Sequence, residues 1–210
     1  MNGAYKVDKK SFRSKCLKKL KNIKDDRVYI NDKIVSKRVN EIIDYHKPKS
    51  ILFYLPMKIE SNLFPSLKQF RKKLKIFVPF IEGESFKMVQ FRLPLRRNSF
   101  GILQPLNSQK RNRSIDMIVV PVIGIDKDYR RVGFGKGMYD RFYEKLKKKP
   151  IVVFVQRVEC KCKHKVTKYY DIKADYYITP KELKMIGKSD VNRSNNSRNR
   201  GYSRWSRSIF

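Results

Sequence analysis

The chain has 210 residues, 40% of them hydrophobic, which is enough for a single folded domain with its own core. No apolar run reaches the roughly 20 residues that span a bilayer, and the N-terminus lacks the apolar core of a signal peptide, so we expect a cytoplasmic protein with no membrane partner. The formal net charge of +32 predicts non-specific attraction to nucleic acid, but the lysines are spread over most of the chain and no nucleic-acid recognition motif accompanies them.

The first quarter of the chain has the pattern of two helices. Asp8 can cap a helix that starts near Lys9, and residues 27–45 predict a second helix, which ends before Pro48. Lys9 and Arg13 are four positions apart and therefore project from one face of the first helix. The apolar stripes expected to face the core are Phe12, Cys16, Leu20 and Ile23 in the first helix and Ile30, Ile34, Val35, Val39, Ile42 and Ile43 in the second.

Short apolar runs predict buried strands through the rest of the chain. They cover residues 51–55, 76–80, 86–91, 115–125, 151–155 and 176–178, the third of them at a sheet edge. Helices are expected between them, one ending near Leu74 and one ending at Lys149. This alternation predicts an α/β fold with a mostly parallel sheet covered by helices on both faces. We expect one domain over residues 1–186 and a disordered, basic Ser/Asn/Arg-rich tail over residues 187–210.

The most informative stretch lies at residues 130–141 and reads Arg-Arg-Val-Gly-Phe-Gly-Lys-Gly-Met-Tyr-Asp-Arg. Its alternate glycines leave backbone N–H groups open to a ligand, and the start of the next helix and the basic side chains add positive charge. Asp140 is well placed to bind magnesium beside a triphosphate. The stretch is neither a Walker A loop nor a regular dinucleotide-binding loop, and a glycine-rich turn with solvated basic side chains is the alternative interpretation.

This stretch, together with Val119-Val120-Pro121 and Gly124-Ile125-Asp126 before it, resembles the signature of the 5-formyltetrahydrofolate cyclo-ligase family. The signature reads Val-Pro-Gly-x-x-Phe-Asp, a short spacer, and Arg-Leu-Gly-x-Gly-x-Gly-Tyr-Tyr-Asp. The chain departs from it by having Val122, Ile125, Val132 and Met138 where the family has glycine, phenylalanine, leucine and tyrosine. The resemblance continues to near Leu183.

The resemblance implies ATP and Mg²⁺ as cofactors. Lys9 and Arg13 match a Lys-x-x-x-Arg pair that contacts the ATP phosphates in the family. Arg131 and Lys136 would stabilise charge on the transferring phosphoryl group and are the implied catalytic residues. The full set implied for ATP is Lys9, Lys10, Ser11, Phe12, Arg13, Arg131, Val132, Gly133, Phe134, Gly135, Lys136, Gly137, Met138 and Tyr139, and the set implied for magnesium is Asp140 and Asp171.

The resemblance also implies a folate site. Leu55 and Glu60 take the positions of an apolar residue and a glutamate that hold the folate in the family, and a carboxylate can pair with the N–H edge of a pterin. Phe100 falls where the family has a ring that stacks on the folate. From the residues alone, Glu60 is also interpretable as a solvated acid at a helix start, and Phe100 as a core side chain. The full set implied for the substrate is Leu55, Glu60, Phe100, Phe134, Gly135, Lys136, Gly137 and Met138.

The family has a three-layer αβα sandwich, akin to the ribose-5-phosphate isomerase and CoA-transferase group, and the resemblance implies this fold. The implied activity is ATP-dependent conversion of 5-formyltetrahydrofolate to 5,10-methenyltetrahydrofolate, with release of ADP and phosphate. We expect a monomer, and the positive surface would suit a polyglutamylated folate.

Other features favour other interpretations. The charge and the arginine-rich tail with Trp205 and Phe210 favour an RNA-associated protein that keeps the fold without the activity, and a different phosphate-transfer enzyme would suit the same scaffold. Cys160, Cys162 and His164 would share one strand face, but their spacing is too tight for the usual zinc loop. The three cysteines of the chain do not predict a disulfide framework.

Overall fold

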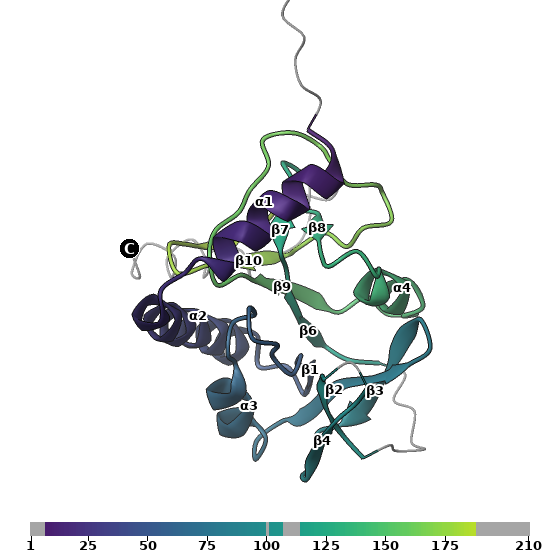
Figure 1. Cartoon of the computed structure of the whole chain (residues 1–210). Coiled ribbons are helices and arrows are strands. Elements are labelled where there is room, and N and C mark those ends of the chain that lie inside the picture. The colour runs from purple at the N-terminus through teal and green to yellow at the C-terminus, as the bar shows by residue number, and fades with distance from the viewer. Residues whose placement is uncertain (1–6, 100, 107–113, 188–210) are drawn as a thin grey trace, which may run out of the picture.

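A seven-stranded sheet forms the centre of the computed structural model, which describes residues 7–99, 101–106 and 114–187 (Figure 1). The strand order is β11-β10-β9-β6-β1-β2-β3. The five inner strands are parallel, whereas the edge strands β3 and β11 run antiparallel to their neighbours. The strands are β1 Ser50–Leu52, β2 Lys75–Glu82, β3 Ser85–Gln90, β6 Met117–Pro121, β9 Ile151–Val155, β10 Tyr176–Ile178 and β11 Leu183–Met185.

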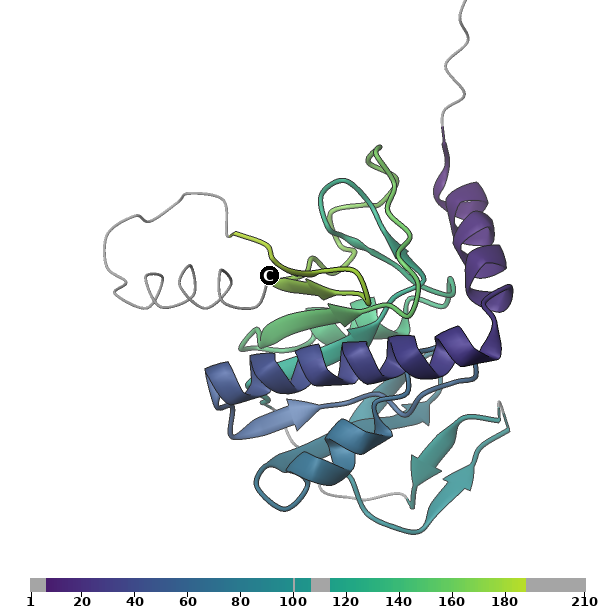
Figure 2. The same cartoon turned by 90° about the vertical axis from the view of Figure 1, so that its left-hand side faces the viewer.

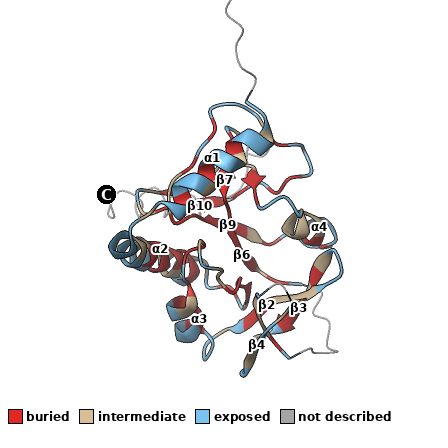
Figure 3. Cartoon of the chain, viewed as in Figure 1, coloured by how far each residue is buried: buried red, intermediate tan, exposed pale blue. Residues whose placement is uncertain are grey.

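The apolar runs form central strands because both of their faces are covered. In β6 all five residues are buried, and Val119 faces one core while Val120 faces the other. Figure 3 shows the buried residues concentrated in the sheet and on the inward faces of the helices. The predicted mostly parallel sheet, with an edge strand near residues 86–91, is therefore confirmed, whereas β11 was not predicted.

Helices lie on both faces of this sheet, in the predicted three-layer arrangement. On one face α2 (Asp25–His46) and α3 (Phe64–Phe70) pack together (Figure 2), and on the other lies α4 (Met138–Glu144). Two helix predictions need correction. Ile30 was expected in the core but is 43% exposed, because the buried stripe of α2 runs through Val35, Val39 and Ile42. The last helix ends at Glu144 rather than Lys149, before four lysines and Pro150.

The first helix, α1 (Lys9–Lys21), packs beside a small hairpin rather than over the main sheet. The hairpin pairs β7 (Gly124–Ile125) with β8 (Arg131–Val132). As predicted, the Asp8 carboxylate caps α1 by accepting hydrogen bonds from the backbone N–H groups of Lys10 and Ser11 at 2.6 and 2.9 Å. The predicted apolar residues Phe12, Cys16 and Leu20 are buried in a third cluster with Ile123, Val132, Cys160 and Cys162.

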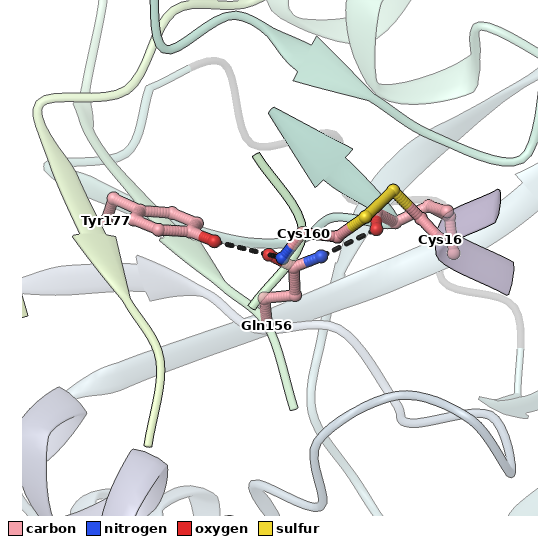
Figure 4. The surroundings of a disulfide bond; sticks show 5 residues. Cys16, Gln156, Cys160 and Tyr177 are labelled. Carbon is pink, nitrogen blue, oxygen red and sulfur yellow. Dashed lines mark hydrogen bonds between the residues drawn. A yellow bond between two sulfur atoms is a disulfide. The ribbon is translucent and has the colours of Figure 1, made fainter. Parts of the chain in front are cut away.

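A disulfide bond joins Cys16 of α1 to Cys160 in the loop after β9 (Figure 4). The sequence did not predict this single bond, since the two residues are 144 positions apart and nothing local in the sequence brings them together. Beside the bond, Gln156 donates to the carbonyl oxygen of Ile123 and accepts from the Cys160 N–H and the Tyr177 hydroxyl. Cys162 is a buried free thiol.

A second small hairpin, β4 (Leu95–Arg97) with β5 (Leu103–Pro105), was not predicted. Phe100 and the tail from residue 188 lie outside the described residues, so their predicted roles stay predictions. None of the described helices has the length and apolarity to cross a bilayer.

Candidate functional site

Two pockets adjoin at the glycine-rich stretch. The larger has a volume of about 670 Å³, in the range typical of small-molecule sites, and is lined mainly by apolar side chains. The smaller has a volume of about 370 Å³ and is lined mainly by charged groups and glycines. Arg131, Gly137 and Arg141 line both pockets, so a ligand in one can meet a ligand in the other there.

The stretch reaches the pockets by a route that sequence analysis did not predict. The buried strand does not lead directly into the glycine loop, because the β7–β8 hairpin lies between β6 and residues 133–137. Gly135 and Gly137 have positive φ angles of 106° and 60°, which other residues rarely adopt. Gly133 is needed for a different reason, because a Cβ there would overlap the Arg131 guanidinium.

Ion pairs between predicted site residues line the smaller, polar pocket. Lys9 Nζ donates to Asp171 Oδ1 and Oδ2 at 2.6 and 2.7 Å. Arg131 Nη1 lies 3.3 Å from Asp140 Oδ2, and Arg13 Nε donates to the carbonyl oxygen of Gly133 at 2.7 Å. The structure thus brings the N-terminal helix, the glycine loop and the segment before β10 to one anion-attracting cavity.

Two of the three carboxylates that line this pocket, those of Asp140 and Asp171, suit a magnesium ion. Magnesium commonly binds one or two carboxylates together with substrate phosphates, and both Asp140 and Asp171 offer oxygen atoms in the same cavity. Their backbone contacts hold them in place, because Asp140 Oδ1 accepts from the Ile172 N–H at 3.1 Å and Asp171 Oδ2 from the Lys168 N–H at 2.7 Å. Among the described residues no cluster of three or more acidic, His or Cys side chains could hold a metal, so phosphates would have to complete the coordination.

The larger, apolar pocket contains one buried acid. Glu60 is only 8% exposed, and burial raises its pKa to about 7, although the Met57 N–H and the Arg131 and Arg157 guanidinium groups favour the charged form. Glu60 Oε2 accepts from the Met57 N–H at 2.9 Å. Leu55 lines the same wall, so the segment after β1 supplies both predicted folate contacts.

The glycine stretch also lines the apolar pocket. Phe134, Lys136, Met138 and Tyr139 all line it. Burial raises the pKa of Tyr139, and the Arg131 guanidinium lies 5.0 Å from the centre of its ring. An apolar cavity with a few fixed polar groups can orient a flat heterocycle.

Some predicted residues lie elsewhere. Lys10 and Ser11 are exposed on α1, and Phe12 and Val132 are buried in the third core cluster, so none of these four lines either pocket. Gly135 lines the polar pocket but not the apolar one.

Several residues that line the pockets were not predicted as site residues. Tyr169 and Tyr170 line the polar pocket and are 84% and 57% exposed. Their position directly before Asp171 in the sequence could have indicated this role. Arg141 directly follows Asp140 and lines both pockets. Tyr54 also lines the apolar pocket, although the apolar run that contains it was predicted only to be a buried strand.

Comparisons with known proteins agree on one family. A model of the 5-formyltetrahydrofolate cyclo-ligase family matches residues 5–166. The 5-formyltetrahydrofolate cyclo-ligase of Mycoplasma genitalium is 26% identical over 151 residues, which cover 70% of this chain and 83% of that protein. The mouse (Mus musculus) protein of the same name is 27% identical over 150 residues, 65% of this chain and 74% of its own.

Solved structures show the same fold. The NMR structure of Aquifex aeolicus 5,10-methenyltetrahydrofolate synthetase superposes with a TM-score of 0.74 at 26% identity, covering 90% of this chain and 97% of that one. The structure of a synthetase of the same name from Mycoplasma pneumoniae has a TM-score of 0.66 at 20% identity and covers 83% and 99%. The predicted αβα architecture is therefore confirmed.

Proposed function

Because the chain belongs to the 5-formyltetrahydrofolate cyclo-ligase family, we propose that it catalyses the ATP-dependent conversion of 5-formyltetrahydrofolate to 5,10-methenyltetrahydrofolate, with release of ADP and phosphate. One observation carries the proposal beyond family membership. An apolar pocket with a single buried acid adjoins a charged pocket lined by four cationic side chains and three carboxylates, and the two share Arg131, Gly137 and Arg141. This arrangement suits a reaction between a flat heterocycle and a triphosphate.

The chemistry explains why two adjoining sites are needed. A formyl amide is a poor electrophile and its oxygen a poor leaving group. Transfer of the γ-phosphoryl group of ATP to the formyl oxygen activates the carbon, N10 of the folate attacks it, and phosphate leaves with the former formyl oxygen while N10 loses its proton. The protein's task is to hold the two substrates in line and to stabilise the charge of the transferring group.

We assign the residues to this task by their position. Lys9 and Arg13 would contact the phosphates from α1, while Arg131, which lines both pockets, and Lys136, which lines the apolar pocket, would stabilise the transferring phosphoryl group. Glu60 would accept hydrogen bonds from the pterin N–H edge. The pterin would lie against the other apolar-pocket residues that the sequence predicted for the substrate, Leu55, Phe134, Gly137 and Met138, with Phe100 as a further predicted contact.

Asp140 and Asp171 would hold the magnesium ion. When bound, the ion offsets phosphate charge and orients the β- and γ-phosphates. Lys9 and Arg131, which pair with these carboxylates, would then turn to the phosphates, so that these two cations and two carboxylates keep partners of opposite sign.

We also propose that the protein acts as a monomer in the cytoplasm, where ATP is available, and that the excess positive charge favours polyglutamylated folates. A disulfide is uncommon in that compartment. Cys16 and Cys160 are 0% and 3% exposed, so the folded protein shields this bond from soluble reductants.

The direct test mixes purified protein, Mg-ATP and 5-formyltetrahydrofolate and follows the methenyl chromophore together with ADP. We expect both products in equal amounts. Lys136→Ala and Arg131→Ala should each lower kcat by about 10²–10³-fold, the usual cost of removing one preorganised charge-stabilising donor. Lys148→Ala, an exposed lysine outside both pockets, is the control. ADP formation without the chromophore would instead indicate another phosphate-transfer reaction. The absence of both products would refute the proposal.

A further inference from the structure

A buried arginine outside both pockets contacts the segment that carries Glu60. Arg157 follows β9 and is 5% exposed. Its Nε and Nη2 donate to Asp32 Oδ1 and Oδ2, both at 2.8 Å, which is a two-pronged contact with fixed geometry. Asp32 lies on the buried side of α2, so this contact anchors the guanidinium to a helix that packs on the central sheet.

The remaining contacts of the guanidinium reach the Glu60 segment. Arg157 Nη1 donates to the Lys58 carbonyl oxygen at 2.8 Å, and Nη2 also donates to the Glu60 carbonyl oxygen. Residues 58–60 belong to neither a helix nor a strand, so no regular backbone ladder fixes them. One planar group therefore joins α2, the loop after β9 and the irregular segment between β1 and α3.

The Glu60 segment is closed on itself at its other side. The Glu60 N–H donates to the Met57 carbonyl oxygen at 3.0 Å, and the Met57 N–H donates to Glu60 Oε2 at 2.9 Å. This turn orients the carboxylate toward the apolar pocket, but both of its hydrogen bonds join residues within 57–60 and do not attach the turn to the sheet. Its position relative to the sheet depends on what holds residues 58–60 from outside.

We propose that Arg157 is a positioning residue for Glu60: anchored by Asp32, it holds residues 58–60 so that the Glu60 carboxylate stays aligned in the apolar pocket. The expected effect on folate binding rests on the proposed function. The positioning of residues 58–60 rests on the observed contacts alone. Misplacing a substrate-orienting group by about 1 Å can cost roughly 10²-fold in rate. The guanidinium also favours the charged form of Glu60, as does that of Arg131.

A purely structural ion pair would give the same contacts, so the test must separate the two roles. Replacing a buried pair by apolar residues of similar volume is often neutral for stability, whereas removing one partner is strongly destabilising. The double variant Asp32→Leu/Arg157→Met therefore keeps a packed interior while removing both hydrogen bonds to the Lys58 and Glu60 carbonyl oxygens. Arg38→Met is the matched control, because Arg38 also lies on α2 and donates to a carbonyl oxygen, that of Thr179, at 2.5 Å.

Kinetics give the first readout. The double variant should raise the KM for 5-formyltetrahydrofolate by about 10–100-fold and leave the KM for ATP within about twofold, because the polar pocket does not contain Glu60. Arg157→Lys, which keeps a donor but loses the planar fork, should show an intermediate increase. Arg38→Met should leave both KM values unchanged. A wild-type folate KM in a folded double variant, or equal increases for both substrates, would overturn the proposal.

Hydrogen exchange gives a second readout that needs no substrate. Amides of residues 57–60 should exchange at least about tenfold faster in the double variant than in wild type, while amides of β2 keep their protection. This result would stand even if the chain acted on another substrate, so it separates failure of the inference from failure of the proposed function. Unchanged exchange at residues 57–60 would show that Arg157 does not hold the segment.

Discussion

The ammonium group of Lys9 lies 2.6 Å from Asp171 Oδ1, although 162 positions of the sequence separate the two residues. The Asp171 side chain is 5% exposed and that of Lys9 29%. A second pair of the same kind joins Arg131 to Asp140 in the same pocket. Both carboxylates that we propose for magnesium are therefore paired with cations that we propose for phosphate. When Mg-ATP binds, the carboxylates would contact the magnesium ion and the cations would contact the phosphates.

Removal of the Lys9 cation should destabilise the protein. Lys9→Met leaves the nearly buried Asp171 carboxylate without its charged partner, and the free energy of unfolding should fall by about 1–2 kcal/mol in urea denaturation. Asp171→Asn in the same chain should recover most of this loss, because the amide carries no charge. Lys10→Met, one position along on the exposed face, is the control. Equal stability of the Lys9 and Lys10 variants would contradict the prediction.

Glu60 should make stability fall as pH rises. Its pKa is about 7 in the folded protein and near 4.5 when unfolded, so between these values the folded state holds a proton that the unfolded state has lost. Folding is thus penalised increasingly from pH 4.5 to pH 7, and the penalty levels off above pH 7. Glu60→Gln should be more stable than wild type by up to about 3 kcal/mol at pH 8 and by little at pH 4.5.

Denaturation at several pH values checks this prediction, with the exposed Asp44→Asn variant on α2 as control. A difference between wild type and Glu60→Gln that stays constant across this range would count against a buried, titrating acid. In the kinetic assay the folate KM of wild type should rise as pH falls below about 7, since protonation adds a donor where an acceptor is needed. Glu60→Gln should lack this rise.

Gly133→Ala should impair turnover more than stability. The new methyl group would overlap the Arg131 guanidinium, which is a flexible side-chain end and can move away. Such movement separates Arg131 from Asp140 and from the junction of the two pockets, so kcat should fall about tenfold or more. The melting temperature should fall by only about 2–4 °C, because Asp140 loses its cation but keeps the hydrogen bond from the Ile172 N–H. Gly187→Ala, where a Cβ meets no atom within 4 Å, should match wild type in both measurements.

Thiol titration should detect the disulfide. In denaturant without reductant, one thiol, that of Cys162, should react, and after reduction all three should react. Cys16→Ser should lower the free energy of unfolding by about 2–4 kcal/mol without reductant, and the difference should shrink when reductant is present. Cys162→Ser keeps the bond and is the control. Three reactive thiols before reduction would contradict the assignment.

Local patterns were enough to predict most of the sheet. The strand at Ile151–Val155 is an uninterrupted apolar run, and the Asp8 cap and the buried stripe of α1 follow from neighbouring residues. The small hairpins were missed because their strands are only two or three residues long and carry no clear alternation. Arg131 shows the same limit, because it lies in the glycine stretch in sequence but belongs to one of these hairpins.

The site was predictable only in parts. The glycine stretch and its neighbours Asp140 and Arg141 are contiguous, so one segment of sequence brings them together. Arg157 and Asp32 form a bond across 125 positions, and only the folded chain relates them. The division of the glycine stretch between two pockets likewise depends on which side of the backbone each residue faces, and this follows from the packing of α4 and α1.

The distance in sequence between Lys9 and Asp171 also bears on synthesis. The first helix leaves the ribosome early, whereas the segment that completes the polar pocket emerges 162 residues later. A partly translated chain therefore cannot complete this pocket until Asp171 is outside the exit tunnel.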